Sequence, residues 1–212
     1  MTSLRISEIF HSLQGEGLDT GLPTVFVRLT GCPLRCRYCD TTYAFKGGRT
    51  LSLEAITEEV ARYATPRVTV TGGEPLAQKG VLELLSHLCD QGHRVALETS
   101  GALDVAPVDP RVTLVMDLKT PGSGEMARNR WENLAHLKAG DQLKFVITDR
   151  DDYLWSREQI ERHPLPGVEP LFSPAWGRLP PARLAQWILD DRLPVRFQIQ
   201  LHKVLWGEEP GR

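Results

Sequence analysis

The stretch that decides what fold to expect is Gly31-Cys32-Pro33-Leu34-Arg35-Cys36-Arg37-Tyr38-Cys39-Asp40. It carries three cysteines in a Cys-x3-Cys-x2-Cys spacing, with no fourth candidate ligand close by. Thiolates at such spacing hold iron–sulfur clusters or zinc, and a structural zinc ion takes four protein ligands. A four-iron cubane held by three thiolates keeps one iron open for a substrate or cofactor. The spacing therefore favours an iron–sulfur cluster that takes part in chemistry.

Working outward from this loop, polar motifs follow apolar, β-branched runs all along the chain. The predicted strands are Leu4–Phe10, Thr24–Thr30, Arg67–Thr71, Arg94–Glu98, Val112–Asp117, Leu143–Thr148, Glu169–Ser173 and Val195–Gln200. The predicted helices are Ser52–Val60, Gln78–Cys89, Trp131–Leu137, Asp151–Arg162 and Arg183–Asp190. Strands that alternate with helices predict a parallel α/β sheet with outer helices, open or closed as a barrel. Such folds place their chemistry at the carboxyl ends of the strands, where the cysteine loop and its companion motifs stand.

Length and composition set broad limits on function. A chain of 212 residues is long enough for one well-filled core, so we expect a single domain over residues 1–212. A net charge of −2 argues against nucleic-acid binding. The absence of a long apolar run argues against a membrane span or a signal peptide. Three crowded cysteines suit a reducing compartment, so we expect a cytoplasmic protein, with the fourth, Cys89, in the core.

Two motifs together carry a family resemblance. The cysteine spacing, with Tyr38 before the last cysteine, resembles the signature of radical S-adenosylmethionine enzymes, and the Gly72-Gly73-Glu74-Pro75 turn strengthens the match. The resemblance implies a partial (β/α) barrel in which Cys32, Cys36 and Cys39 hold a [4Fe–4S] cluster. The open iron would chelate the methionine part of S-adenosylmethionine, and one electron would release a 5′-deoxyadenosyl radical. Glycines let a backbone approach a ligand closely, and Glu74 can accept from an ammonium group.

Further strings are similar to the 7-carboxy-7-deazaguanine synthase family within that superfamily. They are Ile9-Phe10-His11-Ser12-Leu13-Gln14-Gly15-Glu16-Gly17, Phe26-Val27-Arg28-Leu29, Cys39-Asp40-Thr41-Thr42-Tyr43-Ala44, Glu98-Thr99-Ser100-Gly101 and Gln200-Leu201-His202-Lys203. The resemblance implies conversion of 6-carboxy-5,6,7,8-tetrahydropterin to 7-carboxy-7-deazaguanine by ring contraction with loss of ammonia, in queuosine and deazapurine biosynthesis. It also implies Mg²⁺ and a homodimer. Arg35 and Arg37 flank the cluster and could meet an acidic flavodoxin or ferredoxin as electron donor, and the alternative for both is an exposed, solvated arginine.

A bicyclic, amide-rich substrate with a carboxylate needs hydrogen-bonding groups and a cation in its pocket. We expect Gln14 and the backbone of Leu13 and Gly15 to bind the pterin edge, and Arg28 to hold the carboxylate in a bidentate contact. Thr71 touches the substrate by resemblance. The alternative for Gln14 and Glu16 is a solvated turn, and the alternative for Arg28 is a charge on an edge strand in water.

The resemblance also assigns residues to the cofactor and the metal ion. Thr41 would bind Mg²⁺ through its hydroxyl, as one hard oxygen ligand among waters and substrate oxygens. The residues implied to contact S-adenosylmethionine are Tyr38, Cys39 and Asp40 on its adenine side, Gly73, then Asp117, Leu118 and Lys119, and finally Ser173, Pro174, Ala175 and Trp176. Ser173-Pro174 departs from the more familiar Gln-Pro form, so Ser173 would reach the cofactor through its backbone.

Some alternatives stay open on the sequence alone. Lys144 either faces the barrel interior or packs its stem on the core with its ammonium in water. His202 and Lys203 either close the pocket or belong to a solvated tail. At the level of function, the rivals are a glycyl-radical-activating enzyme, for which further cysteines are missing, and a non-enzymatic zinc-binding interaction module.

Overall fold

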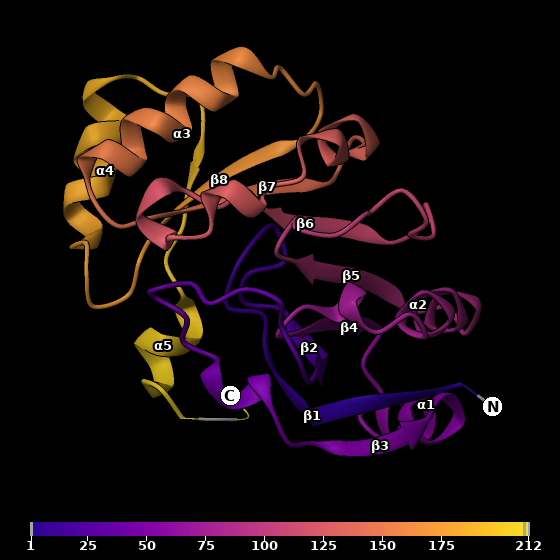
Figure 1. The fold of residues 1–212 in the computed structure, drawn as a ribbon. Helices are drawn as coiled ribbons and strands as arrows, with labels where there is room; N and C mark the ends of the chain where they lie inside the picture. The colour runs from indigo at the N-terminus through magenta and orange to yellow at the C-terminus, as the bar shows by residue number, and fades with distance from the viewer. Residues whose placement is uncertain (1, 210, 212) are drawn as a thin grey trace.

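The computed structural model describes residues 2–209 and 211, which form one nine-stranded sheet with helices packed on its outer face (Figure 1). The strands are β1 (Ser3–Leu13), β2 (Pro23–Leu29), β3 (Arg49–Ser52), β4 (Arg67–Gly72), β5 (Arg94–Thr99), β6 (Thr113–Asp117), β7 (Gln142–Ile147), β8 (Glu169–Pro174) and β9 (Arg196–Phe197). The α-helices are α1 (Leu53–Ala61), α2 (Val81–Asp90), α3 (Arg150–Arg162), α4 (Pro181–Asp190) and α5 (Leu201–Trp206). In this part of the chain, no helix is both long and apolar enough to cross a membrane.

The sheet has the order β3-β1-β2-β4-β5-β6-β7-β8-β9, and every neighbouring pair from β2 to β9 is parallel. Only β1 runs antiparallel to its neighbours β2 and β3. The two ends of the sheet, β3 and β9, are not paired with each other among the described residues, so the barrel is partial. The prediction of a parallel α/β fold that forms an open barrel is confirmed.

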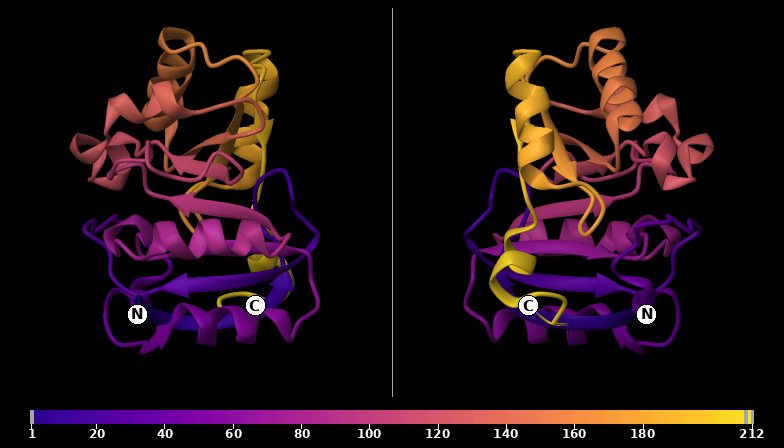
Figure 2. Two further views of the ribbon diagram at one scale, coloured as in Figure 1. Left: turned by 90° about the vertical axis from the view of Figure 1, so that its right-hand side faces the viewer. Right: turned by 90° about the vertical axis from the view of Figure 1, so that its left-hand side faces the viewer.

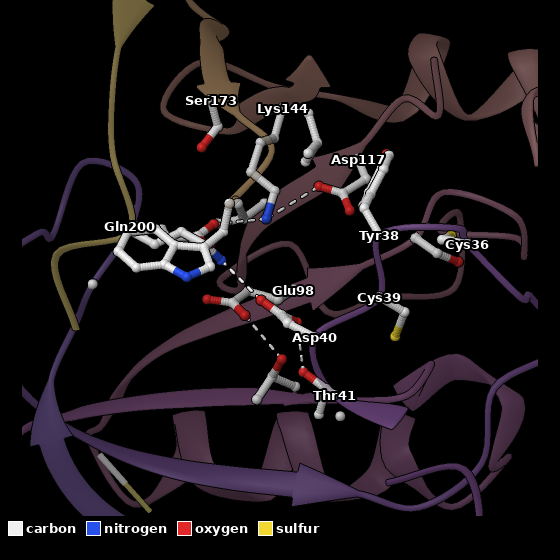
Figure 3. A pocket seen from close by; sticks show the side chains of 18 of the residues that line it. Cys36, Tyr38, Cys39, Asp40, Thr41, Glu98, Asp117, Lys144, Ser173 and Gln200 are labelled. Carbon is white, nitrogen blue, oxygen red and sulfur yellow. Dashed lines mark hydrogen bonds and ion pairs between the residues drawn. The ribbon is translucent and has the colours of Figure 1, made fainter. Parts of the chain in front are cut away.

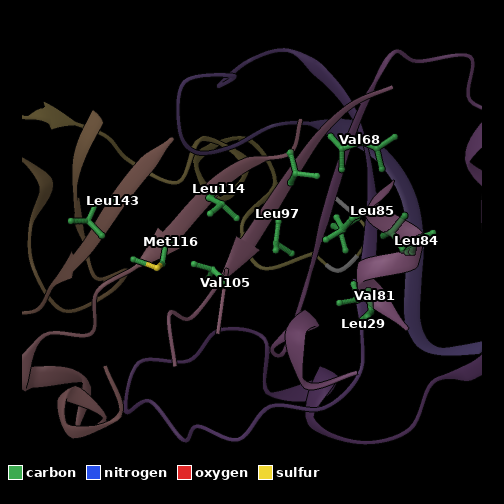
Figure 4. Packing of buried hydrophobic residues seen from close by; sticks show 14 of the residues in the cluster. Leu29, Val68, Val81, Leu84, Leu85, Leu97, Val105, Leu114, Met116 and Leu143 are labelled. Carbon is green, nitrogen blue, oxygen red and sulfur yellow. The ribbon is translucent and has the colours of Figure 1, made fainter. Parts of the chain in front are cut away.

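Strand residues alternate between the helix-covered face and the barrel interior. On β4, Val68 and Val70 are buried in the hydrophobic cluster, whereas Thr69 and Thr71 line cavities on the other face. Figure 4 shows Val81, Leu84 and Leu85 of α2 in this cluster, beside the outward-facing side chains of the strands. The outer face therefore holds the core, and the inner face is free to carry polar side chains.

The chain after α4 returns to the N-terminal half of the molecule, as Figure 2 shows from two sides. The strand predicted over Val195–Gln200 is only two residues long, because Gln198 and Gln200 turn their side chains to the N-terminal segment. The Leu201 amide then donates to the Gly15 carbonyl, at 3.0 Å, where the helix α5 begins. Neither α5 nor the short edge strand β3 was predicted.

The helix predicted over Trp131–Leu137 is instead a 3₁₀-helix over Trp131–His136. The buried side chain of Asn133 explains the difference, since it donates to the carbonyls of Gly101 and Leu103 and accepts from the amide of Val105. These contacts tie the segment to a distant loop, and tertiary hydrogen bonds of this kind override a local helical pattern. The other predicted helices are confirmed within a few residues at their ends.

Candidate active site

A cavity of about 220 Å³ lies at the carboxyl ends of the parallel strands (Figure 3). The structure brings into it every predicted site residue except Leu118. These are Leu13, Gln14, Gly15, Arg28, Cys32, Cys36, Tyr38, Cys39, Asp40, Thr41, Thr71, Gly73, Asp117, Lys119, Ser173, Pro174, Ala175 and Trp176. Leu13 and Trp176, which are 163 positions apart in the sequence, therefore line the same cavity.

The three cysteines of the loop are each half-buried and free of disulfides. Burial raises the pKa of all three thiols, that of Cys36 to about 11. The amide of Leu34 donates to the sulfur of Cys32 at 3.4 Å, a contact that favours a thiolate ligand. Without a bound metal these groups stay protonated at neutral pH, so binding a cluster releases protons.

The arrangement of these sulfurs fits a cluster better than a single ion. Among residues 2–209 and 211, no three Cys, His, Asp or Glu side chains converge on a point where one metal ion would bind. A structural zinc site needs such convergence. The thiolates of a cubane each bind a different iron atom, so they need only line the same cavity, as these three do.

The glycine turn packs directly against the cysteine loop. The amides of Gly73 and Glu74 donate to the carbonyls of Leu29 and Gly31, at 3.1 and 2.7 Å. A Cβ atom added to Gly73 would lie 2.2 Å from the Gly31 carbonyl oxygen and 2.9 Å from the Cβ of Cys32. Glycine is required here because the two backbones touch.

The carboxylate of Glu74 has a different role from the one expected. It is fully buried and accepts from the amide of Leu76, the hydroxyl of Thr99, and both the amide and the hydroxyl of Ser100. With these partners it is not available to an incoming ammonium group. The expectation that Glu74 binds the cofactor directly is wrong, and the residue instead joins the glycine turn to the loop after β5.

We expect Gly73→Ala to cost about 1–3 kcal/mol, the usual range for overpacking, and to reduce the iron content per chain after reconstitution. The cause is displacement of the cysteine loop by the new methyl group. Denaturant unfolding and iron analysis measure the two effects. Gly80→Ala is the control, since its added Cβ would meet chiefly the side chain of Thr2, near the chain end. Equal iron content in both variants would contradict the proposed contact.

A chain of buried charges crosses the cavity. The ammonium of Lys144 lies 2.8 Å from Glu16 Oε2 and 3.3 Å from Asp117 Oδ1, and Asp117 also pairs with Lys119. Burial opposes the charged form of both acids, but the lysines outweigh it and hold the pKa of Glu16 and Asp117 below the usual range. Lys144 thus faces the barrel interior, and its alternative placement in water is wrong.

The C-terminal helix α5 closes the other side of the cavity. The ammonium of Lys203 lies 2.6 Å from Asp40 Oδ2, and the side-chain amide of Gln200 donates to Asp40 at 3.0 Å and to Glu16 at 2.8 Å. His202 packs on Gly15, where an added Cβ would come within 2.0 Å of the His202 ring. Lys203 is only 7% exposed, so the alternative of a solvated tail is wrong.

We expect acid to weaken this closure. Burial opposes the charge on Asp40, but Lys203 outweighs burial and holds the pKa of Asp40 well below its usual range. A carboxylate with a depressed pKa in the folded state stabilises the protein above its unfolded pKa, which is about 4. That stability is lost as the pH falls toward the pKa of Asp40 in the folded protein. The difference in unfolding free energy between the wild type and Asp40→Asn should therefore have its full size above roughly pH 5 and become smaller below roughly pH 4.

Chemical denaturation at a series of pH values measures this difference. Glu58→Gln is the matched control, because Glu58 is exposed on α1. A gap between wild type and Asp40→Asn that does not change between pH 3 and 6 would exclude the ion pair as its source.

The residues expected to bind a substrate form a connected network. Gln14 is 6% exposed and donates to Thr69 Oγ1 and Glu98 Oε1, each at 3.2 Å, so the alternative of a solvated turn is wrong. Thr71 donates to Glu98 Oε2 at 2.8 Å. Glu98 is a central residue that sequence reasoning quoted but gave no role. The signal that could have found it is its place at the end of a predicted strand, in the motif Glu98-Thr99-Ser100-Gly101.

Arg28 lies on β2, inside the sheet between β1 and β4, so its alternative placement on an edge strand is wrong. Its Nε donates to Glu8 Oε1 at 2.7 Å, and its guanidinium lies 5.7 Å from the centre of the Phe10 ring. These contacts hold the side chain of Arg28 in place, and its guanidinium group still lines the cavity.

Two other residues lie away from the cavity. Leu118 is 3% exposed and belongs to the hydrophobic cluster, because the residues on either side of it, Asp117 and Lys119, turn inward. Its side chain therefore points away from the cavity, and the expected contact of Leu118 with the cofactor would use its backbone. Cys89 packs partly buried against the same cluster, as expected.

Comparisons with known proteins agree with this picture. Residues 26–114 match the model of the radical SAM superfamily. The 7-carboxy-7-deazaguanine synthase of Chlorobaculum tepidum is 47% identical over 210 residues, covering 97% of this chain and 96% of that protein. The protein of the same name from Koribacter versatilis is 42% identical and covers 97% of this chain and 98% of its own length.

Among solved structures, QueE from Escherichia coli matches with a TM-score of 0.78 at 22% identity, over 94% of this chain and 95% of that one. Streptococcus suis SuiB bound to S-adenosylmethionine matches with a TM-score of 0.57 at 16% identity, over 79% of this chain and 48% of that one. Identities this low compare the folds alone.

Proposed function

The chain belongs to the 7-carboxy-7-deazaguanine synthase family of the radical SAM superfamily, and we propose that it converts 6-carboxy-5,6,7,8-tetrahydropterin to 7-carboxy-7-deazaguanine. The observation that carries this proposal is the single cavity that joins three free thiols to Arg28, Gln14 and Thr71. The conversion rearranges the ring and releases one ammonia, so atoms balance without an external oxidant.

Cys32, Cys36 and Cys39 would hold the [4Fe–4S] cluster, and the backbone around Gly73, with Tyr38 and Lys119, would form the cofactor side of the cavity. When bound, the reduced cluster and S-adenosylmethionine supply the radical that starts the reaction. Burial raises the pKa of Tyr38 to about 12, so its hydroxyl stays neutral beside the cofactor. The protein adds orientation and the exclusion of water.

The remaining cavity residues suit the pterin. Gln14 offers an amide to the edge of a bicyclic ring, and its contacts with Thr69 and Glu98 fix its orientation. Arg28 presents a cation with Nη groups that its pairing with Glu8 does not use. The α5 helix, held by Lys203 and Asp40, would keep water from the bound substrate.

We also place Mg²⁺ at Thr41. The hydroxyl of Thr41 donates to Asp40 Oδ1 at 2.9 Å, which leaves its oxygen lone pairs directed elsewhere and able to bind a hard cation. One threonine oxygen is a weak ligand alone, so waters and substrate oxygens would complete the six-fold shell that this ion prefers.

The test of the whole proposal is product analysis. The chain is reconstituted with iron and sulfide without oxygen, reduced, and incubated with S-adenosylmethionine, Mg²⁺ and the carboxytetrahydropterin. We expect a product lighter by one ammonia, identified by mass spectrometry and by comparison with 7-carboxy-7-deazaguanine. A fully loaded protein that consumes no pterin would contradict the assignment.

Arg28→Lys should raise the KM for the pterin by about 10- to 100-fold with a smaller change in kcat, since a lysine keeps the charge beside Glu8 but loses the planar fork. Steady-state kinetics measure both constants. Arg183→Lys on the exposed start of α4 is the control and should leave them unchanged. If the KM of Arg28→Lys equals that of the wild type, Arg28 does not hold the carboxylate.

An acidic flavodoxin or ferredoxin would supply the electron at the outer side of the cysteine loop. Arg35, Arg37 and Arg178 are exposed there, and Arg178 donates to the carbonyl of Arg37. Steering by such a patch weakens as salt is added. We further propose that the protein is cytoplasmic and forms a homodimer. Sedimentation of the purified chain would test whether it is a dimer.

A further inference from the structure

A second cavity, of about 350 Å³, opens at the amino ends of β4, β5 and β6, away from the cysteine loop. In Figure 1 these ends are the blunt ends of the β5 and β6 arrows. Gln14, Glu16 and Val115 line both cavities, so a single layer of side chains separates them. The proposed reaction gives this cavity no role.

The walls of this cavity repeat one sequence feature. Three consecutive strands begin or are preceded by the same dipeptide: Arg67-Val68, Arg94-Val95 and Arg111-Val112. All three valines belong to the hydrophobic cluster on the outer face. Because strand residues alternate between faces, Arg67 and Arg94 take the inner face and line the cavity. Arg111 precedes β6 and also lines the cavity, but its guanidinium pairs with Asp90 and donates to the Ser86 carbonyl, both on the outer helix α2.

The positive charges in this layer are only partly balanced. Arg111 is paired with Asp90 and Asp109. In the part of the chain that the structure describes, Arg67 pairs only with Asp19, at 3.6 Å, and its buried Nε has no hydrogen-bond acceptor. Arg94 is exposed, and within residues 2–209 and 211 its side chain forms no hydrogen bond or ion pair. His93 beside it also lines the cavity.

Arg67 and Arg94 are also direct Cα partners in the parallel register of β4 and β5. Like charges placed side by side on neighbouring strands destabilise a sheet. Of the two carboxylates in the cavity lining, Glu16 is paired with Lys144, and Asp19 lies 3.6 Å from Arg67. Two adjacent guanidinium groups with so little opposing charge are an arrangement that an anion would stabilise.

We propose that this cavity binds a polyphosphate, with Arg67 and Arg94 as its principal ligands. The guanidinium group matches phosphate oxygens through two parallel N–H donors, and such charge-assisted bonds are the strong ones. The cavity is larger than one phosphate requires, and the hydroxyl of Thr113 on its wall adds a further polar group. The same chemistry suits a free polyphosphate or the phosphate tail of a nucleotide.

Calorimetric titration of the full chain tests this, with inorganic triphosphate and ATP as separate probes. We expect one site, which Arg94→Gln and Arg67→Gln each weaken by about tenfold, equivalent to about 1.4 kcal/mol. Arg183→Gln, an exposed arginine on α4, should bind as the wild type does. Asp19→Asn should bind about threefold tighter, because it removes the carboxylate that competes for Arg67. A gain of affinity does not arise from misfolding.

Tighter binding of ATP would assign the site to a nucleotide, and equal or tighter binding of triphosphate would assign it to free polyphosphate. Either result, with the variants as described, supports the proposal. No binding of either probe at millimolar concentration overturns it, as does binding that none of the three cavity variants changes. The titration needs no enzyme turnover, so its failure would leave the proposed activity untouched.

Discussion

Cys36→Ala is expected to lower turnover of the carboxytetrahydropterin by a factor on the order of 1,000 or more, to the background of the assay. The two remaining thiols, of Cys32 and Cys39, cannot complete a three-thiolate cluster, and no further cysteine among the described residues lines the cavity. Iron and sulfide content and the visible absorption of the reconstituted protein should fall in parallel. The measurements are an anaerobic product assay and metal analysis on the same sample.

Cys89→Ala is the matched control, since Cys89 lies on α2, packs against the hydrophobic cluster and is not in the cavity lining. It should keep the iron content and the activity of the wild type. Cys36 is half-buried and lies outside the hydrophobic core, so we expect the Cys36→Ala protein to fold. Circular dichroism checks this. Full turnover by a folded Cys36→Ala protein would end the radical assignment.

Lys144→Met is expected to lower the free energy of unfolding by about 3–5 kcal/mol, the cost of removing one partner from a buried ion pair. The side chains of Lys144 and Glu16 are each 13% exposed, and that of Asp117 is 16% exposed. Without the ammonium, Glu16 keeps only the Gln200 amide, and Asp117 keeps only Lys119. Chemical denaturation at neutral pH measures the loss.

The loss should shrink in acid, because Glu16 and Asp117 lose their depressed pKa values when Lys144 is removed and then take up protons more readily. Lys79→Met, at an exposed position, is the control and should change stability by less than about 0.5 kcal/mol. The double variant Lys144→Met with Glu16→Gln should recover part of the loss, since it removes one of the two uncompensated charges. A double variant no more stable than Lys144→Met would show that Glu16 is not the partner left unpaired.

The sequence was most informative where the alternation of apolar residues and the chemistry of the polar residues predict the same structure. The alternation of Val and Thr on β4 specifies both a buried face and a polar face, and the cysteine loop follows the preceding strand directly. Carboxyl ends of parallel strands meet at one edge, so motifs at several such ends were expected to converge, and they do.

The sequence was less informative wherever a side chain has a distant partner. Asn133 lies in a segment with a helical pattern that forms a 3₁₀-helix, because its side chain binds a loop about 30 residues away. The carboxylate of Glu74 accepts hydrogen bonds from Thr99 and Ser100. Neither partner can be read from local periodicity. The helix α5 was missed for a similar reason, since it is short and is held by Asp40 rather than by an apolar stripe of its own.

Sequence patterns were enough to predict the parallel α/β fold, the position of the three-cysteine loop and most of the residues that line the cavity. These follow from periodicity and from the geometry of strand ends, which are local properties of the chain. The pairing of Lys144 with Glu16 and Asp117, and the closure of the cavity by α5, became visible only in the folded chain. The same holds for the inward layer of Arg67 and Arg94. Each of these depends on which buried charges become neighbours, and burial makes their pairing obligatory only once the strands have been brought together.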